Sequence, residues 1–314
     1  MTRVEPGAVE RICCIGAGVI GSGWVAHFLA RGYRVSAWDP APDGEARMNR
    51  LVEAAWPALE QLGLAVGASR DRLVFEPTLA RAVEGAAFVQ ESAPDRLPLK
   101  IDLLAEIDAA AMPEAVIASS TSGFGMTEMQ VKAARPERLV VGHPFNPPYL
   151  VPLVEVVGGA RTAPDAVDWA TAFYEAAGKT AVRMSREVPG FIANRLQEAL
   201  WYEALHMVAA GEATVEEIDL AVTAGPGLRW AFMGPFLTFH LAGGEGGMGH
   251  MLNHWPPGSM DPAWTRLVPP AVEGALRDGI VEGCEAEAAG RGPTELIAER
   301  DRKLIAVIKA LREA

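Results

Sequence analysis

A histidine and a glutamate stand twelve residues apart in the stretch VGHPFNPPYLVPLVEVVGG, which covers residues 141–159. His143 follows a short apolar run, and Glu155 lies in a strand-like run after a proline-rich turn. Histidine exchanges protons near neutral pH, and a carboxylate on its second ring nitrogen sets the tautomer and stabilises the imidazolium. The two residues can therefore be a general base and its orienting partner. The alternative is a buried structural histidine, with a glutamate that merely ends a strand.

A glycine-rich turn near the N-terminus has the spacing of a dinucleotide-binding loop. It reads Gly16-x-Gly18-x-x-Gly21 and lies between a short apolar strand and a helical stretch. In such a loop the first glycine permits a tight turn and the second lets the backbone approach a pyrophosphate. The third lets the helix pack against its strand, and the phosphates lie at the helix N-terminus. The residues expected to contact the cofactor are Gly16, Ala17, Gly18, Val19, Ile20 and Gly21.

The next strand, residues 33–38, ends at Asp39. A carboxylate at this place binds a ribose 2′-hydroxyl and repels the 2′-phosphate that distinguishes NADP from NAD. No arginine follows Asp39 directly to accept such a phosphate. The predicted cofactor is therefore NAD.

The first half of the chain alternates short apolar strands with helices, which is typical of a parallel sheet covered on both faces. Helices are predicted over 45–62 and 97–110. Strands are predicted over 12–15, 33–38, 73–75, 87–90, 115–119, 139–141, 153–157 and 179–184. After the break at Pro189-Gly190 the pattern is helical to the end. We expect an α/β Rossmann-type doubly wound sheet in a domain over 1–186, followed by an all-α C-terminal domain over 187–314.

The composition excludes several classes of protein. A formal net charge of −12 argues against binding to nucleic acid or to an anionic membrane surface. The three cysteines, Cys13, Cys14 and Cys284, form no disulfide framework, and the N-terminus has no signal pattern, so a cytoplasmic protein is expected. His250 and His254 have the spacing of a metal pair but lack the glutamate of a zinc protease helix and an obvious third ligand. No metal site is predicted.

Four stretches, in this order along the chain, resemble the 3-hydroxyacyl-CoA dehydrogenase superfamily. They are ASSTSGF with Ser122, GHPFNPP with His143, LVEVVGG with Glu155 and PGFIANR with Asn194. The resemblance implies NAD-dependent oxidation of a secondary alcohol, with His143 as the general base and Glu155 as its partner. It also implies that Ser122 and Asn194 hydrogen-bond the substrate oxygen.

The same resemblance implies a further part of the NAD site in APDRLPLK, where the family has an acid and a lysine. Asp95 and Lys100 occupy these positions, and Asp95 replaces the glutamate that is usual there. The family habit of a homodimer formed through the helical domain is also expected, and apolar helices such as 191–208 permit it.

The stretch AGPGLRWAFMGPF resembles the branch of the superfamily that contains the dehydrogenases of L-gulonate and L-carnitine and the structural protein lambda-crystallin. Several other stretches look closest to the L-carnitine members. The expected substrate is therefore L-carnitine, a 3-hydroxy acid with a quaternary ammonium group. L-gulonate, a 3-hydroxyacyl-CoA such as 3-hydroxybutyryl-CoA, and a crystallin-like structural role are the alternatives.

A quaternary ammonium group is held by aromatic faces, and a carboxylate is held by arginine. Arg229 is the predicted carboxylate partner. Ordinary helix packing is the alternative for the aromatic residues of the second domain. The aromatic candidates are Trp201, Tyr202, Trp230, Phe232 and Phe236.

Overall fold

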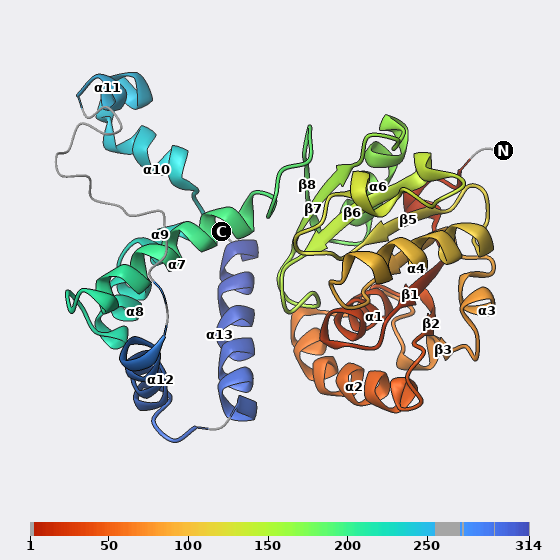
Figure 1. Ribbon diagram of the computed structural model, residues 1–314, viewed down its shortest axis with the longest axis horizontal. Coiled ribbons are helices and arrows are strands. Elements are labelled where there is room, and N and C mark those ends of the chain that lie inside the picture. The colour runs from red at the N-terminus through yellow and green to blue at the C-terminus, as the bar shows by residue number, and fades with distance from the viewer. Residues whose placement is uncertain (1–2, 255–270, 272, 292, 314) are drawn as a thin grey trace. The chain divides into compact units, whose positions relative to one another are not determined.

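The computed structural model of the chain describes residues 3–254, 271, 273–291 and 293–313 (Figure 1). It divides into two compact units, Met1–Asn194 and Arg195–Ala314. The sequence predicts a domain boundary after residue 186, and residues 187–194 belong to the first unit. Within the described ranges, no helix is both long enough and apolar enough to cross a membrane.

An eight-stranded sheet forms the centre of the first unit, in the order β3-β2-β1-β4-β5-β6-β7-β8. The strands are β1 (Arg11–Ile15), β2 (Arg34–Trp38), β3 (Leu73–Phe75), β4 (Phe88–Glu91), β5 (Val116–Ser119), β6 (Leu139–Pro144), β7 (Leu153–Gly158) and β8 (Thr180–Arg183). The first six run parallel, while β7 pairs antiparallel with β6 and parallel with β8. The sequence predicts the strands but not this reversal, because an apolar run carries no direction.

Helices cover both faces of the sheet, as the doubly wound prediction requires. One face carries α1 (Val19–Ala30), α2 (Gly44–Leu62) and α6 (Pro164–Ala176), and the other carries α3 (Leu79–Val83), α4 (Leu97–Ala110) and α5 (Met126–Met129). The alternation of side chains along β1 explains the two cores: Cys14 packs into the first, and Cys13 into the second. Burial raises the pKa of Cys13 to about 12. Both thiols are therefore packing residues of the two cores.

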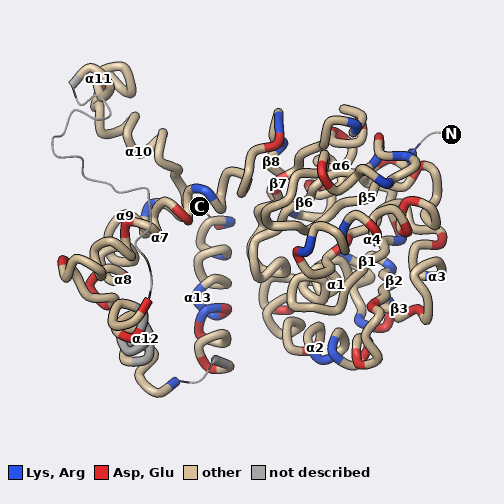
Figure 2. The backbone as a smooth tube through the Cα atoms, viewed as in Figure 1, with Lys and Arg blue, Asp and Glu red and all other residues tan. Residues whose placement is uncertain are grey.

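The second unit is helical throughout its described residues, which confirms the predicted all-α domain. Its helices are α7 (Ala193–Ala209), α8 (Val215–Ala224), α9 (Pro226–Trp230), α10 (Pro235–Ala242), α11 (Gly247–His254), α12 (Gly274–Ala288) and α13 (Pro293–Glu313). Figure 2 shows α10 and α11 without a single charged residue. The side chains of His254 and Cys284 lie outside the described residues.

Candidate active site

The glycine loop between β1 and α1 has the backbone geometry that a dinucleotide requires. Gly16 has φ +102°, and a Cβ on it would lie 2.7 Å from the carbonyl oxygen of Ser92. A Cβ on Gly21 would lie 1.9 Å from the Gly16 carbonyl oxygen, so α1 can approach β1 only without a side chain there. Gly18 has open space around its Cβ position. Its backbone is therefore accessible to a pyrophosphate at the start of α1.

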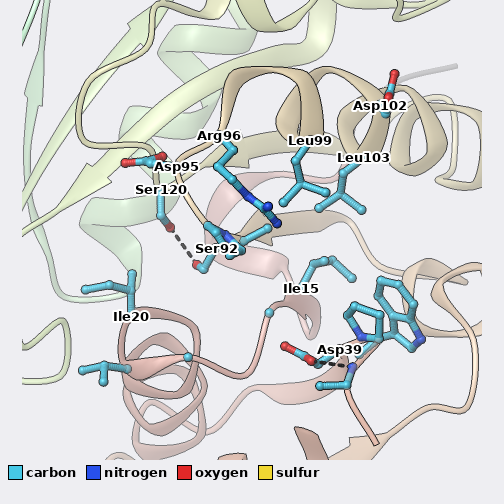
Figure 3. Close-up of a pocket in the computed structure, with 18 of the residues that line it drawn as sticks. Ile15, Ile20, Asp39, Ser92, Asp95, Arg96, Leu99, Asp102, Leu103 and Ser120 are labelled. Carbon is cyan, nitrogen blue, oxygen red and sulfur yellow. Dashed lines mark hydrogen bonds between the residues drawn. The ribbon is translucent and has the colours of Figure 1, made fainter.

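A cavity of about 780 Å³ opens in front of this loop, at the carboxyl ends of β1, β2, β4 and β5 (Figure 3). The strand order reverses between β1 and β4, and doubly wound sheets bind ligands at such a point. Of the residues predicted to contact NAD, the cavity wall holds Gly16, Gly18, Val19, Ile20, Asp39 and Asp95. Ala17, Gly21 and Lys100 do not line it.

Asp39 lies at one end of the cavity, and Asp95 and Ser120 lie at the other (Figure 3). The Asp39 carboxylate accepts hydrogen bonds from the amides of Ala17 at 2.7 Å and Ala41 at 2.9 Å. These bonds hold it at the end of β2, where an adenine ribose would lie in this fold. The open glycine loop and the fixed carboxylate both fit NAD.

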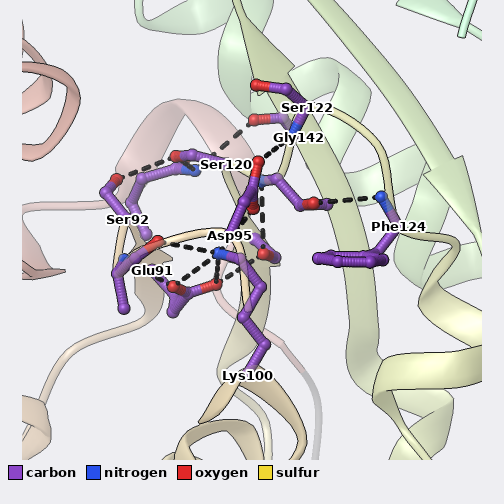
Figure 4. Close-up of polar contacts among 12 residues, drawn as sticks. Glu91, Ser92, Asp95, Lys100, Ser120, Ser122, Phe124 and Gly142 are labelled. Atoms are coloured by element: carbon purple, nitrogen blue, oxygen red, sulfur yellow. Dashed lines mark hydrogen bonds and ion pairs between the residues drawn. The ribbon is translucent and has the colours of Figure 1, made fainter. Parts of the chain in front are cut away.

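Lys100 is buried beneath the loop that follows β4 (Figure 4). Its Nζ lies 2.9 Å from Glu91 Oε1 and 3.3 Å from Asp95 Oδ1. Asp95 in turn accepts the backbone N–H of Ser122 at 2.9 Å. Lys100 Nζ also donates to the carbonyl oxygen of Ala93 at 3.1 Å. Lys100 therefore holds two residues of the cavity wall, Ala93 and Asp95, without lining the cavity itself.

Glu91 is a residue of this group that the sequence does not single out. It is fully buried at the end of β4 and accepts hydrogen bonds from the Ala93 amide at 2.6 Å and the Ser119 hydroxyl at 2.5 Å. A buried carboxylate needs such partners, because an unpaired one is costly. The available signal is a glutamate directly after the run Phe88-Val89-Gln90, nine residues before the first lysine of the chain.

His143 and Glu155 are direct partners across the antiparallel pair β6–β7. The distance from His143 Nδ1 to Glu155 Oε2 is 2.9 Å, and both side chains are buried. The second carboxylate oxygen, Oε1, accepts the backbone N–H groups of Ile192 at 2.8 Å and Ala193 at 3.0 Å. The reversal of β7 is what turns a separation of twelve residues into this contact.

These contacts keep Glu155 ionised. Burial alone would raise the pKa of this carboxyl, but the hydrogen bonds from His143 and from the amides of Ala193 and Ile192 outweigh burial and lower it. An ionised carboxylate can only accept, so His143 Nδ1 carries its hydrogen. In the neutral imidazole Nε2 is then the acceptor atom, and none of the described residues hydrogen-bonds to it. The arrangement can take a proton from a substrate hydroxyl.

Phe191 covers the His143 ring and is a site residue that the sequence does not predict. The centroids of the two rings are 5.0 Å apart, and the Phe145 ring lies 5.4 Å from His143. Phe191 has φ +55°, which is unusual for a residue with a side chain, and follows Gly190 at φ +73°. Such backbone strain often marks a functional site. Here the turn brings the Phe191 ring to His143 and the next two amides to Glu155.

Asn194 and Ser122 are brought together at the edge of the cavity. Asn194 Nδ2 donates to the Ser122 carbonyl oxygen at 3.0 Å, and Ser122 lines the cavity. The four residues of the predicted catalytic set therefore form two contacting pairs. The segment 191–194 joins them, because it contacts Glu155 at one end and Ser122 at the other.

The side chains predicted to hold the carboxylate and the quaternary ammonium group belong to the second unit. Arg229, Trp230 and Phe232 share one turn, since the Phe232 amide donates to the Arg229 carbonyl at 3.1 Å. The exposed fractions are 53% for Trp201, 44% for Trp230, 62% for Phe232 and 82% for Phe236, so none of these rings is a fully buried core residue. The Tyr202 hydroxyl donates to Glu198 at 2.6 Å. No ring contact joins any two of these five aromatics.

Two family models match the chain: the 3-hydroxyacyl-CoA dehydrogenase NAD binding domain over residues 11–188 and the C-terminal domain of the same family over 190–272. The chain is 67% identical to an L-carnitine dehydrogenase of Nocardiopsis dassonvillei, covering 99% of this chain and 94% of that protein. It is 66% identical to an L-carnitine dehydrogenase of Streptomyces coelicolor, with coverages of 98% and 96%.

A solved structure is also similar over nearly its full length. It is 5-formyl-3-hydroxy-2-methylpyridine 4-carboxylic acid 5-dehydrogenase, an NAD+-dependent dismutase, with a TM-score of 0.82 and 30% identity, covering 97% of this chain and 99% of that one. The similar sequences, the doubly wound sheet and the glycine loop all indicate the same family. The chain belongs to the 3-hydroxyacyl-CoA dehydrogenase family, and it is an NAD-dependent dehydrogenase with the NAD-binding and C-terminal domains of that family.

Proposed function

We propose that this protein oxidises L-carnitine to 3-dehydrocarnitine. The observation that carries the chemistry is the buried His143–Glu155 pair, whose free Nε2 can accept a hydroxyl proton. The substrate rests on the relatives in Nocardiopsis and Streptomyces, both named L-carnitine dehydrogenase and both matched over nearly the whole chain.

In this reaction the C3 hydroxyl proton goes to His143 Nε2, and the C3–H bond breaks as the ketone forms. NAD, when bound, accepts the hydride. The imidazolium that results is stabilised by Glu155, which the amides of Ile192 and Ala193 hold in place. Ser122 and Asn194, which contact each other, are proposed to hydrogen-bond the substrate oxygen and stabilise developing alkoxide charge.

The distribution of charge favours L-carnitine over a CoA thioester. CoA carries phosphates that need basic partners, and the region after β2 has no lysine, since Lys100 is the first in the chain. In α2 the positive charges of the two arginines are offset by the negative charges of Glu45, Glu53 and Glu60 (Figure 2). The exposed aromatics of the second unit offer ring faces for a trimethylammonium group, and Arg229 offers a partner for the carboxylate.

The deciding experiment compares initial rates with NAD on L-carnitine, L-gulonate, 3-hydroxybutyrate and 3-hydroxybutyryl-CoA. L-carnitine should give the highest kcat/KM, and the CoA thioester little or no turnover. If L-gulonate or the thioester has the highest value, the substrate assignment is wrong. The family assignment and the role of His143 would not be affected by that result.

A homodimer and a cytoplasmic location are part of the same proposal. The second unit leaves large apolar side chains exposed on α9 and α10, among them Leu228, Leu237 and Leu241. A second copy of the chain would cover such a surface, because patches of this kind are uncommon on monomers. The free thiols of Cys13 and Cys14 suit a reducing compartment.

A further inference from the structure

Arg47 reaches the NAD cavity from the first turn of α2, although it is eight residues from Asp39 in the sequence. Its Nε donates to the carbonyl oxygen of Ala17 at 3.0 Å, and its Nη2 lies 3.4 Å from Asp39 Oδ1. Its Nη1 lies 3.1 Å from Asp43 Oδ2. One guanidinium therefore bridges the glycine loop and the acid that would hold the ribose.

The two carboxylates do not hold Arg47 equally. The Asp39 side chain is 13% exposed and is fixed by two backbone amides, whereas the Asp43 side chain is 69% exposed. An exposed pair of the Asp43 kind contributes little, on the order of 0–1 kcal/mol. Arg47 Nη1 contacts both oxygens of Asp43, at 3.1 and 3.2 Å, but solvent screens that pair. The longer contact with Asp39 is the one that lies inside the cavity wall, where its charge is less screened.

An arginine beside the ribose-binding residue is the group that accepts the 2′-phosphate of NADP. A guanidinium binds phosphate oxygens through charge-assisted, often bidentate, hydrogen bonds. In this cavity Arg47 already lies beside the ribose-binding residue Asp39, but the carboxylates of Asp39 and Asp43 offset its positive charge. Asp39 would also repel a 2′-phosphate directly.

We propose that Arg47 is a cofactor-specificity residue. Its guanidinium could bind the 2′-phosphate of NADP, but the carboxylate of Asp39 prevents this. The proposal rests on the preference for NAD over NADP that Asp39 predicts. The Asp39 carboxylate then has two effects: it repels the 2′-phosphate, and it neutralises the charge of Arg47. Removing the charge of Asp39 should therefore do more than end a repulsion, because it should also create a phosphate site.

The test uses 5′-AMP and adenosine 2′,5′-bisphosphate, which differ only in the 2′-phosphate, with binding measured by isothermal titration calorimetry. The unmodified protein should bind 5′-AMP more tightly. Asp39→Asn should raise the affinity for the bisphosphate by about tenfold or more, since one charge-assisted contact is worth that much. The double variant Asp39→Asn/Arg47→Gln should lose most of this gain. Asp43→Asn, which removes the exposed partner of Arg47, is the matched control and should give no such gain.

Each contrary result has a distinct meaning. If the double variant keeps the gain, or if Asp39→Asn shows none, Arg47 is not a binding group for the 2′-phosphate, while the preference for NAD stands. If the unmodified protein already favours the bisphosphate, the NAD preference itself is wrong. Thermal melting checks that each variant is folded, and Asp39→Ser, with its short polar side chain, replaces Asp39→Asn if that variant unfolds.

Discussion

The hydrogen bond between His143 Nδ1 and ionised Glu155 leaves one ring nitrogen to take the substrate proton. His143→Gln keeps a polar side chain of similar size but removes the base. We expect kcat to fall by about 10²–10⁴-fold, the usual contribution of a positioned general base. The affinity for NADH should stay nearly unchanged, because His143 does not line the cavity.

Initial rates with L-carnitine and a fluorescence titration with NADH measure these two quantities separately. A variant that retains a near wild-type rate would end the general-base assignment. A variant that loses NADH binding as well would show that the substitution disturbs the whole unit rather than the proton transfer.

Among the structural elements, the segment 187–194 has the greatest effect on the site. Glu187 accepts the Thr127 amide at 2.9 Å and also the Thr127 hydroxyl, and the residues that follow reach Glu155 and Ser122. Loss of the Glu187 contacts should loosen the amides that orient Glu155. Glu187→Ala should therefore lower kcat/KM by roughly 3–30-fold, which corresponds to one or two lost hydrogen bonds.

The matched control for this variant is Arg186→Ala, which changes the exposed neighbouring residue. Initial rates over a range of L-carnitine concentrations are the measurement, with NADH affinity expected to be unchanged in both variants. An equal effect of the two substitutions would argue against a specific role of the Glu187–Thr127 contact.

The elements differ in how far they can be predicted from sequence. The parallel strands follow from apolar runs, and the glycine loop follows from local backbone requirements at Gly16 and Gly21. The contact of His143 with Glu155 depends on the reversal of β7, and the contact of Arg47 with Asp39 depends on where α2 begins. Phe191 could not be predicted, because its role comes from a left-handed backbone conformation that a phenylalanine rarely adopts. The spacing of residues in the sequence predicts which side chains could take part in chemistry. Which of them contact one another depends on the tertiary fold.

The loop between β6 and β7 is anchored by a buried lysine. Lys179 Nζ donates to the carbonyl oxygens of Val151, at 2.9 Å, and Pro148, and it lies 4.8 Å from the centre of the Trp24 ring. Burial, with a smaller contribution from the charge of Arg31, lowers its pKa from 10.5 to about 7. Between these two values the unfolded chain holds a proton that the folded chain does not. The contribution of Lys179 to stability should therefore rise as the pH rises from about 7 toward 10.5.

Lys179→Met should remove this dependence. As the pH rises, the free energy of unfolding of the unmodified protein should increase relative to that of the variant. The increase should be at most about 1.4 kcal/mol per pH unit. Urea unfolding at several pH values between 6.5 and 9.5 measures it. Lys132→Met, at an exposed lysine paired with Asp102, is the control and should show no such trend. A difference that is constant with pH would mean that Lys179 stays protonated in the folded chain.

For the whole molecule, the apolar side chains of α10 in the second unit are the surface that we propose lies between two copies of the chain. Phe236 is 82% exposed and Phe239 51%, on a helix with no charged residue (Figure 2). Burial of two such rings in an interface would contribute a few kcal/mol, at about 25 cal/mol per Å² of apolar surface. We expect light scattering to give twice the 33.4 kDa mass of one chain.

The double variant Phe236→Glu/Phe239→Glu places charges on this helix and should shift the mass toward that of a single chain. Val66→Glu, at a fully exposed position of the first unit, is the control and should leave the mass unchanged. The affinity of the double variant for NADH should also be unchanged, because the NAD cavity is built from the first unit alone. A monomeric unmodified protein, or a double variant that remains dimeric, would mean that this helix does not form the interface between two copies.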